Sequence, residues 1–511
     1  MHGVRITILA ALAALTTPAQ ANWLRADTDS FIIYSEGNEK SLRTFAENLQ
    51  RFDATLGTRF GLKKAPEPNR LTIYLLPRGV DVGRLVTGKS GSFIGGWYRP
   101  DPEGSYAVSH RENDVIKGTP QSQQTLFHEY SHHFMKRYAA AAYPAWFIEG
   151  FAEYYSTADF TTDGRAEIGK PVHARAHGLL TMPKIPAETI LLQQPGEMRN
   201  SDQTDVYYGR SWLLTHMLYN DPARAGQLTK YIDAINRGED GKKAAIDAFG
   251  DLAALDKDLN RYMTKPMTYR ISSEPAVVSG KISITALSPA EDALLPLHLE
   301  RMSGQNDEER VVKVRDDLKA LSLVHGGDAG VWFELASAEW AIDEDKRDMA
   351  AARAAVDKAL AIDPKHVRAN VLLGRILTAE VEAKDDPGPE DWNAVRKPII
   401  LANRTNPDDP VPLYAYFESF ADQGRWPPPI AIEGLRRAFQ LAPEDIGVRM
   451  TYAFALANDE RYDEALALAK AVAFDPHDGG QGEQLLARLE AMRSQGAARA
   501  SAAAAEEAAD E

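Results

Sequence analysis

The sequence contains no cysteine among its 511 residues. This absence excludes disulfide bonds, thiolate metal ligands and lipid attachment at a processed N-terminal cysteine. Any bound metal must therefore be held by His, Asp or Glu. Lysine and arginine are also fewer than aspartate and glutamate, so the net charge is -15 and the isoelectric point is near 5.4. A protein of this charge does not attract a polyphosphate backbone, so we expect no nucleic-acid partner.

Long hydrophobic runs are lacking as well. The apolar run at residues 6–15 is about ten residues long, whereas a helix needs roughly 20 to cross a bilayer. Arg5 precedes this run, and Ala-Gln-Ala at residues 19–21 has the small-x-small pattern that signal peptidase cleaves. The sequence predicts a signal peptide over residues 1–21 that is cut after Ala21. The mature protein is expected to be periplasmic or secreted, without stable membrane insertion.

The chain is too long for a single core, since domains usually contain about 100 to 200 residues. Residues 30–35 and 70–76 have the composition of β-strands, and residues 40–56 have helical apolar spacing. Residues 91–100 and 105–110 are expected to form a hairpin around a turn. Helices are expected at 122–138, 144–157, 205–220, 224–237 and 241–264. We therefore predict an α+β unit, a small sheet followed by helices, over residues 22–266, and an irregular linker over 267–306.

An internal repeat begins near residue 307. Similar helix endings stop at Pro364, Pro407, Pro443 and Pro476, which are 43, 36 and 33 residues apart. A proline after the second helix of each pair, at a spacing that settles near 34, resembles degenerate tetratricopeptide (TPR) repeats. The sequence predicts an all-α repeat domain over residues 307–490 that binds a protein partner. A disordered tail rich in Ala and Glu is expected at residues 491–511.

One short motif suggests metal chemistry. His128 and His132 are four residues apart, so on a helix both imidazoles face the same side and can reach one ion. Glu129 would lie beside that ion. Because two histidines cannot complete a catalytic zinc site, a third protein ligand is needed. The segment WFIEGFAEYY, which starts at residue 146, provides Glu149 and Glu153 four residues apart on one helical face.

The two motifs together resemble those of the gluzincin metallopeptidases, the thermolysin-like and peptidase MA-like proteins. The resemblance covers about residues 90–265. It implies a thermolysin-like zincin fold that uses Zn²⁺ to hydrolyse peptide bonds of a peptide or protein substrate. It further implies that His128, His132 and Glu149 bind the metal, and that Glu153 orients a ligand histidine. Glu129 would be the general base that takes a proton from water.

Two further features could complete such a site. The negative oxygen formed during amide hydrolysis needs a hydrogen-bond donor. The resemblance implies a tyrosine or histidine from a helix after the zinc ligands, and the expected helix at 205–220 offers Tyr208 as first candidate and Tyr207 as second. The alternative is that both rings only pack in the core or the cleft wall. Gly95 and Gly96 would let an extended substrate approach the strand at 91–100, although an ordinary buried strand also fits. His173 and His177 are expected in a solvated loop.

Three functions fit these patterns. The first is an exported zinc endopeptidase whose repeats bind a partner or substrate. The second is a periplasmic TPR interaction protein in which the zincin unit is a catalytically inactive scaffold, although an inactive scaffold has no chemical need for Glu129. The third is hydrolysis of a non-peptide amide, such as a cell-wall crosslink, by the same residues. The Gly-x-Met-Glu-Asn motif of zinc aminopeptidases is missing before the metal helix, which argues against that activity.

Overall fold

The computed structural model describes residues 23–63, 65–89, 94–112, 120–278, 280–304, 307–475 and 480–509, with side chains as far as residue 496. The predicted signal peptide and residues 91–93 of the predicted hairpin lie outside these ranges. Within them, no helix combines the length and the hydropathy that crossing a bilayer requires.

Six strands form one mixed sheet in the order β4-β5-β3-β2-β1-β9. Strands β2, β3 and β5 run parallel, whereas β4 pairs antiparallel with β5 at one edge of the sheet. The predicted strands at 30–35 and 70–76 and the predicted hairpin are confirmed. The strands of this sheet are β1 (Trp23–Asp27), β2 (Phe31–Glu36), β3 (Leu71–Leu76), β4 (Trp97–Arg99), β5 (Tyr106–His110) and β9 (Ser283–Ala286).

Helices pack against this sheet and continue the unit beyond it. A smaller sheet, with strands β6 (Asp159–Phe160), β7 (Arg165–Ile168) and β8 (Arg270–Pro275), lies among them. We call β1 to β9 with their helices the N-terminal unit. Its helices are α1 (Glu39–Arg59), α2 (Gly79–Thr87), α3 (Gln121–Tyr138), α4 (Ala145–Ser156), α5 (Ala176–Thr181), α6 (Ala187–Leu192), α7 (Ser201–Asn220), α8 (Gln227–Asn236), α9 (Gly241–Phe249) and α10 (Leu252–Tyr262).

Helix α3 is anchored firmly to α1. The rings of Phe52 and Phe127 stack with their centroids 4.0 Å apart, and both are fully buried. The buried hydroxyl of Tyr130 donates a hydrogen bond to Asp53. These contacts bury one face of α3 and leave the histidine face for other partners. The other predicted helices are confirmed, except that the helix expected at 241–264 is two helices. The break falls at Gly250, whose φ of +84° ends α9.

The linker expected at residues 267–306 is wrong. This segment contains β8, β9 and the helix α11 (Pro289–Ser303). Strand β9 pairs with β1. The side chains of Leu295 and Leu299 on α11 are buried in one cluster with Val108 of the sheet. A capping box between Ser288 and Glu291 starts α11. The apolar residues of this segment thus fasten the following helices to the sheet, which a solvated linker would not do.

The remaining chain is an array of helix pairs, which confirms the predicted all-α repeats. Helices α14, α16 and α18 each end two residues before Pro364, Pro407 and Pro443, as the repeat pattern predicts, while Pro476 lies outside the described residues. The helices are α12 (Glu308–Val324), α13 (Ala329–Trp340), α14 (Met349–Ile362), α15 (Val367–Glu382), α16 (Pro389–Thr405), α17 (Pro410–Ala421), α18 (Pro429–Leu441), α19 (Ile446–Asn458), α20 (Tyr462–Ala473) and α21 (Gln481–Ala509).

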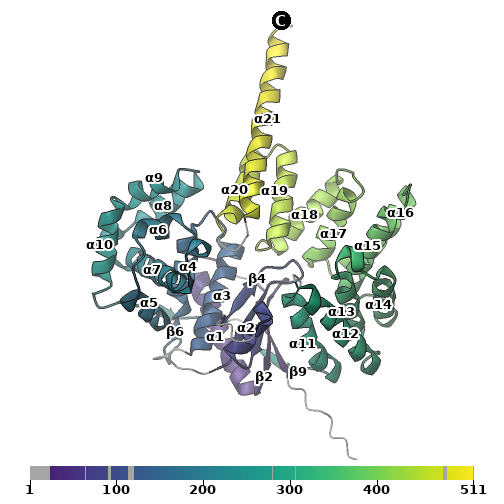
Figure 1. Ribbon diagram of the computed structural model, residues 1–511, viewed down its shortest axis with the longest axis horizontal. Helices are drawn as coiled ribbons and strands as arrows, with labels where there is room; N and C mark the ends of the chain where they lie inside the picture. The colour runs from purple at the N-terminus through teal and green to yellow at the C-terminus, as the bar shows by residue number, and fades with distance from the viewer. Residues whose placement is uncertain are drawn as a thin grey trace, which may run out of the picture.

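The array begins with α11 rather than near residue 307, and it curves along one side of the N-terminal unit (Figure 1). We call α11 to α21 the repeat array. The tail that was expected to be disordered at 491–511 is helical as far as Ala509, because α21 continues through it. Alanine and glutamate are good helix formers, so the same composition that indicated disorder also permits a projecting helix.

Candidate metal centre

Helix α3 brings two histidine side chains together, as the sequence predicts. His128 and His132 are one turn apart, and their Nε2 atoms are 3.1 Å from each other. Both rings point away from the face that packs on α1, since i and i+4 share one side of a helix. Two imidazole nitrogens are therefore presented to a common point at the surface of α3.

Helix α4 contributes the third group. Glu149 is fully buried, and its Oε2 atom lies 3.5 Å from Nε2 of His128 and 3.6 Å from Nε2 of His132. The glycine that follows has a packing role, because a Cβ atom at Gly150 would lie 2.2 Å from Oγ1 of Thr215 on α7. Close packing of α4 on α7 therefore requires glycine beside Glu149 and fixes the depth of that carboxylate.

The three donor atoms have the spacing that a zinc ion needs. Tetrahedral zinc with bonds of about 2.0–2.1 Å places its ligand atoms about 3.3 Å apart. The separations of 3.1, 3.5 and 3.6 Å lie close to this value. Among the described residues this is the one group of three such side chains within metal-binding reach. His128, His132 and Glu149 thus fit zinc by donor type and geometry.

The charge around this trio is strongly negative. Burial disfavours a charged His128, but the carboxylates of Glu149, Glu153 and Glu129 outweigh it and raise the pKa of His128 to about 9. A cation at this point is therefore favoured electrostatically. A divalent metal is a cation that satisfies the carboxylates while leaving both imidazoles neutral.

Glu153 lies behind His128, one helical turn beyond Glu149. Its Oε1 atom is 3.7 Å from Nδ1 of His128, the ring nitrogen opposite the candidate metal position. The same oxygen accepts hydrogen bonds from Arg175 at 2.6 and 3.0 Å. Arg175 also donates to Asp205 at 2.6 Å, which continues the network onto α7. Glu153 is therefore placed to orient His128, as second partners of metal-bound histidines do.

The structure separates the two tyrosine candidates. The ring of Tyr208 lies 6.5 Å from that of His128, and the negative charge of Glu149, together with burial, raises the pKa of Tyr208. The phenol thus stays protonated and able to donate. Tyr207 is fully buried and donates to the carbonyl oxygens of Ile190 and Gln193 instead. The second candidate, Tyr207, is wrong because its hydroxyl is engaged away from the site.

Strand β4 approaches the site from the sheet. It is the edge strand beside β5, so one side of its backbone has no neighbouring strand within the described part of the sheet. A Cβ atom at Gly96, just before β4, would lie 2.4 Å from Cγ2 of Thr125 and 3.0 Å from Cγ of Glu129. The backbone here passes directly over the candidate general base, and only glycine permits this approach.

Arg175 is the important residue that the sequence does not reveal. The segment around His173 and His177 is expected to be a solvated loop, yet it forms a short 3-10 helix, η1 (His173–Arg175), followed by α5. Both histidines are exposed as expected, whereas Arg175 turns inward to Glu153. A buried carboxylate needs a cationic partner, but nothing in the sequence shows which arginine supplies it.

This chain matches solved structures at low sequence identity. No protein-family model matches it, and no curated protein matches it. Three similar solved structures are TTC0263, a thermophilic TPR protein of Thermus thermophilus (18% identity, 40% of this chain and 98% of that chain, TM-score 0.32), a MamA RS-1 ArsTM double mutant (15%, 36% and 94%, 0.26) and yeast Tom70 (13%, 78% and 79%, 0.28). At these TM-scores the likenesses carry no conclusion about function.

Proposed function

We propose that the N-terminal unit is an exported zinc-dependent peptidase. The observation that carries this proposal is the spacing of His128, His132 and Glu149, whose donor atoms are arranged as tetrahedral zinc requires. Glu129 follows His128 on the same helix, and Tyr208 faces the same group of carboxylates. The chain therefore supplies a ligand set, a base and a donor within one site.

The roles of the side chains follow from their positions. Zinc, when bound, supplies a Lewis acid that activates water and polarises a substrate carbonyl. Glu129 takes a proton from the attacking water and delivers it to the nitrogen of the leaving amine, so that the amide bond breaks. Tyr208 donates a hydrogen bond to the carbonyl oxygen as negative charge develops there. Strand β4 offers its outer edge to pair with an extended peptide.

The test is hydrolysis of a mixed peptide library by the purified full chain with zinc. We expect wild type to cleave peptides, and Glu129→Gln to retain zinc but lose cleavage, since Gln cannot accept the proton. Glu188→Gln on the exposed surface of α6 is the matched control and should cleave like wild type. Equal cleavage by Glu129→Gln and wild type would contradict the proposal.

A second candidate is a non-catalytic protein that binds partners through the repeat array. Its support is the array itself, because stacked helix pairs commonly present extended binding surfaces. The two candidates differ in their use of zinc. If the zinc-loaded wild type leaves every library peptide intact, the second candidate is favoured over the peptidase.

A further inference from the structure

The repeat array forms hydrogen bonds with the β4–β5 hairpin, which contains the edge strand beside the candidate metal site. Arg368 on α15 donates a 2.8 Å hydrogen bond to the carbonyl oxygen of Glu103 in the hairpin turn. Tyr106 at the start of β5 donates to the carbonyl oxygen of Met302 on α11, at 3.3 Å. The hairpin tip is therefore held by repeat helices as well as by its own sheet.

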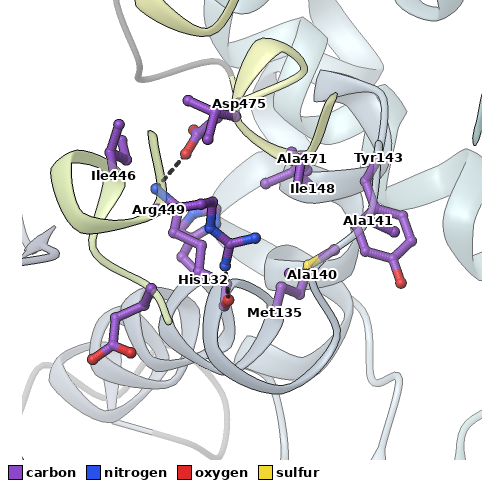
Figure 2. Close-up of a pocket in the computed structure, with 13 residues that line it drawn as sticks. His132, Met135, Ala140, Ala141, Tyr143, Ile148, Ile446, Arg449, Ala471 and Asp475 are labelled. Carbon is purple, nitrogen blue, oxygen red and sulfur yellow. Dashed lines mark hydrogen bonds and ion pairs between the residues drawn. The ribbon is translucent and has the colours of Figure 1, made fainter. Parts of the chain in front are cut away.

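The array also contacts the C-terminal end of α3, the helix that carries both histidines. Lys136 pairs with Asp475 at 2.6 Å, and Arg449 donates to the carbonyl oxygen of Lys136 at 3.0 Å. Figure 2 shows Arg449 and Asp475 reaching across from the repeat side into a pocket that His132 also lines. The contact therefore begins four residues, about one helical turn, after the candidate metal ligand His132.

One repeat residue joins the two contacts. Glu444, in the turn before α19, is only 2% exposed. Its Oε1 atom accepts a 2.9 Å hydrogen bond from Oγ of Ser105 in the hairpin. Its Oε2 atom accepts from Nη1 of Arg137 on α3, at 2.7 Å. A single carboxylate thus bridges the strand side and the helix side of the metal site.

We propose that Glu444 is a positioning residue, and that the repeat array is an internal clamp that fixes β4 relative to α3. The consequence for catalysis rests on the proposed peptidase function, because a substrate paired with β4 must lie at the correct distance from Glu129 and the ligand histidines. Catalytic groups lose efficiency when their separation from substrate changes by about 1 Å. Strand β4 spans only Trp97–Arg99 and pairs with β5 on one side, so it depends on the support of its hairpin tip.

Charged hydrogen bonds inside a protein are stronger than neutral ones, which suits Glu444 to this role. Arg137 does not depend on Glu444 alone, because it also pairs with Glu67 at 2.9 Å. Loss of the Glu444 carboxylate therefore leaves α3 anchored through Glu67 and removes the hold on the hairpin at Ser105. Substitution of Glu444 should therefore affect the hairpin more than α3.

The experiment is hydrogen exchange of the full chain, wild type against Glu444→Ala, which removes both hydrogen bonds of the bridge, with zinc content measured in parallel. We expect exchange of the β4 and β5 amides to rise by about tenfold or more in the variant, with zinc retained. Glu339→Ala is the matched control, since Glu339 is also buried in the array but pairs with Arg315 on α12. It should leave exchange in the hairpin unchanged.

Ser105→Ala removes only one arm of the bridge and serves if Glu444→Ala does not fold. It should also raise hairpin exchange, and if the chain is a peptidase it should lower kcat with zinc retained. Unchanged hairpin exchange in the folded variants would overturn the clamp, whether or not wild type cleaves peptides. Absence of hydrolysis by wild type with faster hairpin exchange in the variants would overturn the peptidase function only.

Discussion

Arg175 donates two hydrogen bonds to one oxygen of Glu153, from Nη2 at 2.6 Å and from Nε at 3.0 Å. The carboxylate held in this way is the one that lies behind the Nδ1 atom of His128. The network thus leads from η1 through α4 to α3. A residue that contacts neither histidine is placed to control how one of them presents its nitrogen to a metal.

Arg175→Met should therefore weaken zinc binding. Removing the arginine frees Glu153 to rotate, and loss of such outer partners typically reduces metal affinity by about 10- to 100-fold. Competition with a chelator of known affinity measures the change. Arg165→Met is the control, since the side chain of Arg165 pairs with Asp163 at the exposed surface. Equal zinc affinity in Arg175→Met and wild type would show that Glu153 needs no such support.

Tyr208→Phe should keep zinc and lower kcat. The lost hydroxyl is the proposed donor to the developing oxyanion, and removal of one such donor costs about 10²- to 10³-fold in kcat. Tyr207→Phe should behave differently, because its hydroxyl bonds buried carbonyl groups. We expect it to lower the free energy of unfolding by about 1 kcal/mol with kcat preserved. A steady-state assay in which Tyr207→Phe lowers kcat while Tyr208→Phe preserves it would assign the donor role to Tyr207 instead.

Gly96→Ala should impair catalysis by displacing the strand side of the site. A methyl group there would lie 2.4 Å from Thr125 and 3.0 Å from Glu129, so the backbone of residue 96 or the two side chains must move. We expect kcat/KM for peptides to fall with little change in zinc content. Gly95→Ala is the matched control, because its added Cβ would meet Thr125 at an ordinary 3.5 Å. Equal effects of the two substitutions would contradict the close approach of β4 to Glu129.

Much of this site could be predicted from the sequence, because helix periodicity alone places His128 and His132 on one face. Glu149 needed the family resemblance, since its contact with them depends on how α3 packs against α4. Arg175 and Glu444 could not be predicted in the same way. Each meets its partner through tertiary packing, Arg175 with Glu153 across 22 residues and Glu444 with Arg137 across 307. The sequence does not predict the elements at 267–306, because short strands and a helix with an internal proline give weak periodicity.

The contact between the repeat array and the N-terminal unit also predicts that stability depends on pH. Burial raises the pKa of Asp445 to about 6, and the nearby acids Asp101 and Glu444 act in the same direction. The folded pKa exceeds the ordinary value, so protonation favours the folded state below about pH 4, and this contribution is lost as pH rises through about 6. Above that pH the buried ionised carboxylate destabilises the fold, because each tenfold difference in proton affinity between the folded and unfolded states corresponds to about 1.4 kcal/mol.

Asp445→Asn should therefore raise the free energy of unfolding by about 1–3 kcal/mol at pH 7, and have little effect at pH 4. Asparagine keeps the cap on α19, where Asp445 now accepts from the backbone nitrogen of Val448. Denaturant titration at the two pH values measures the difference. Asp251→Asn, at the exposed cap of α10, is the control and should change little at either pH. A loss of stability at pH 7 in Asp445→Asn would show that the negative charge is needed.

Zinc content of the purified full chain tests the central claim most directly. We expect one zinc per chain in wild type and in Glu129→Gln, and loss of that zinc in His132→Ala and in Glu149→Ala, because each of these two variants removes one of the three ligands. Wild type that takes up no zinc, or a Glu149→Ala variant that binds zinc as tightly as wild type, would contradict the assignment of this site.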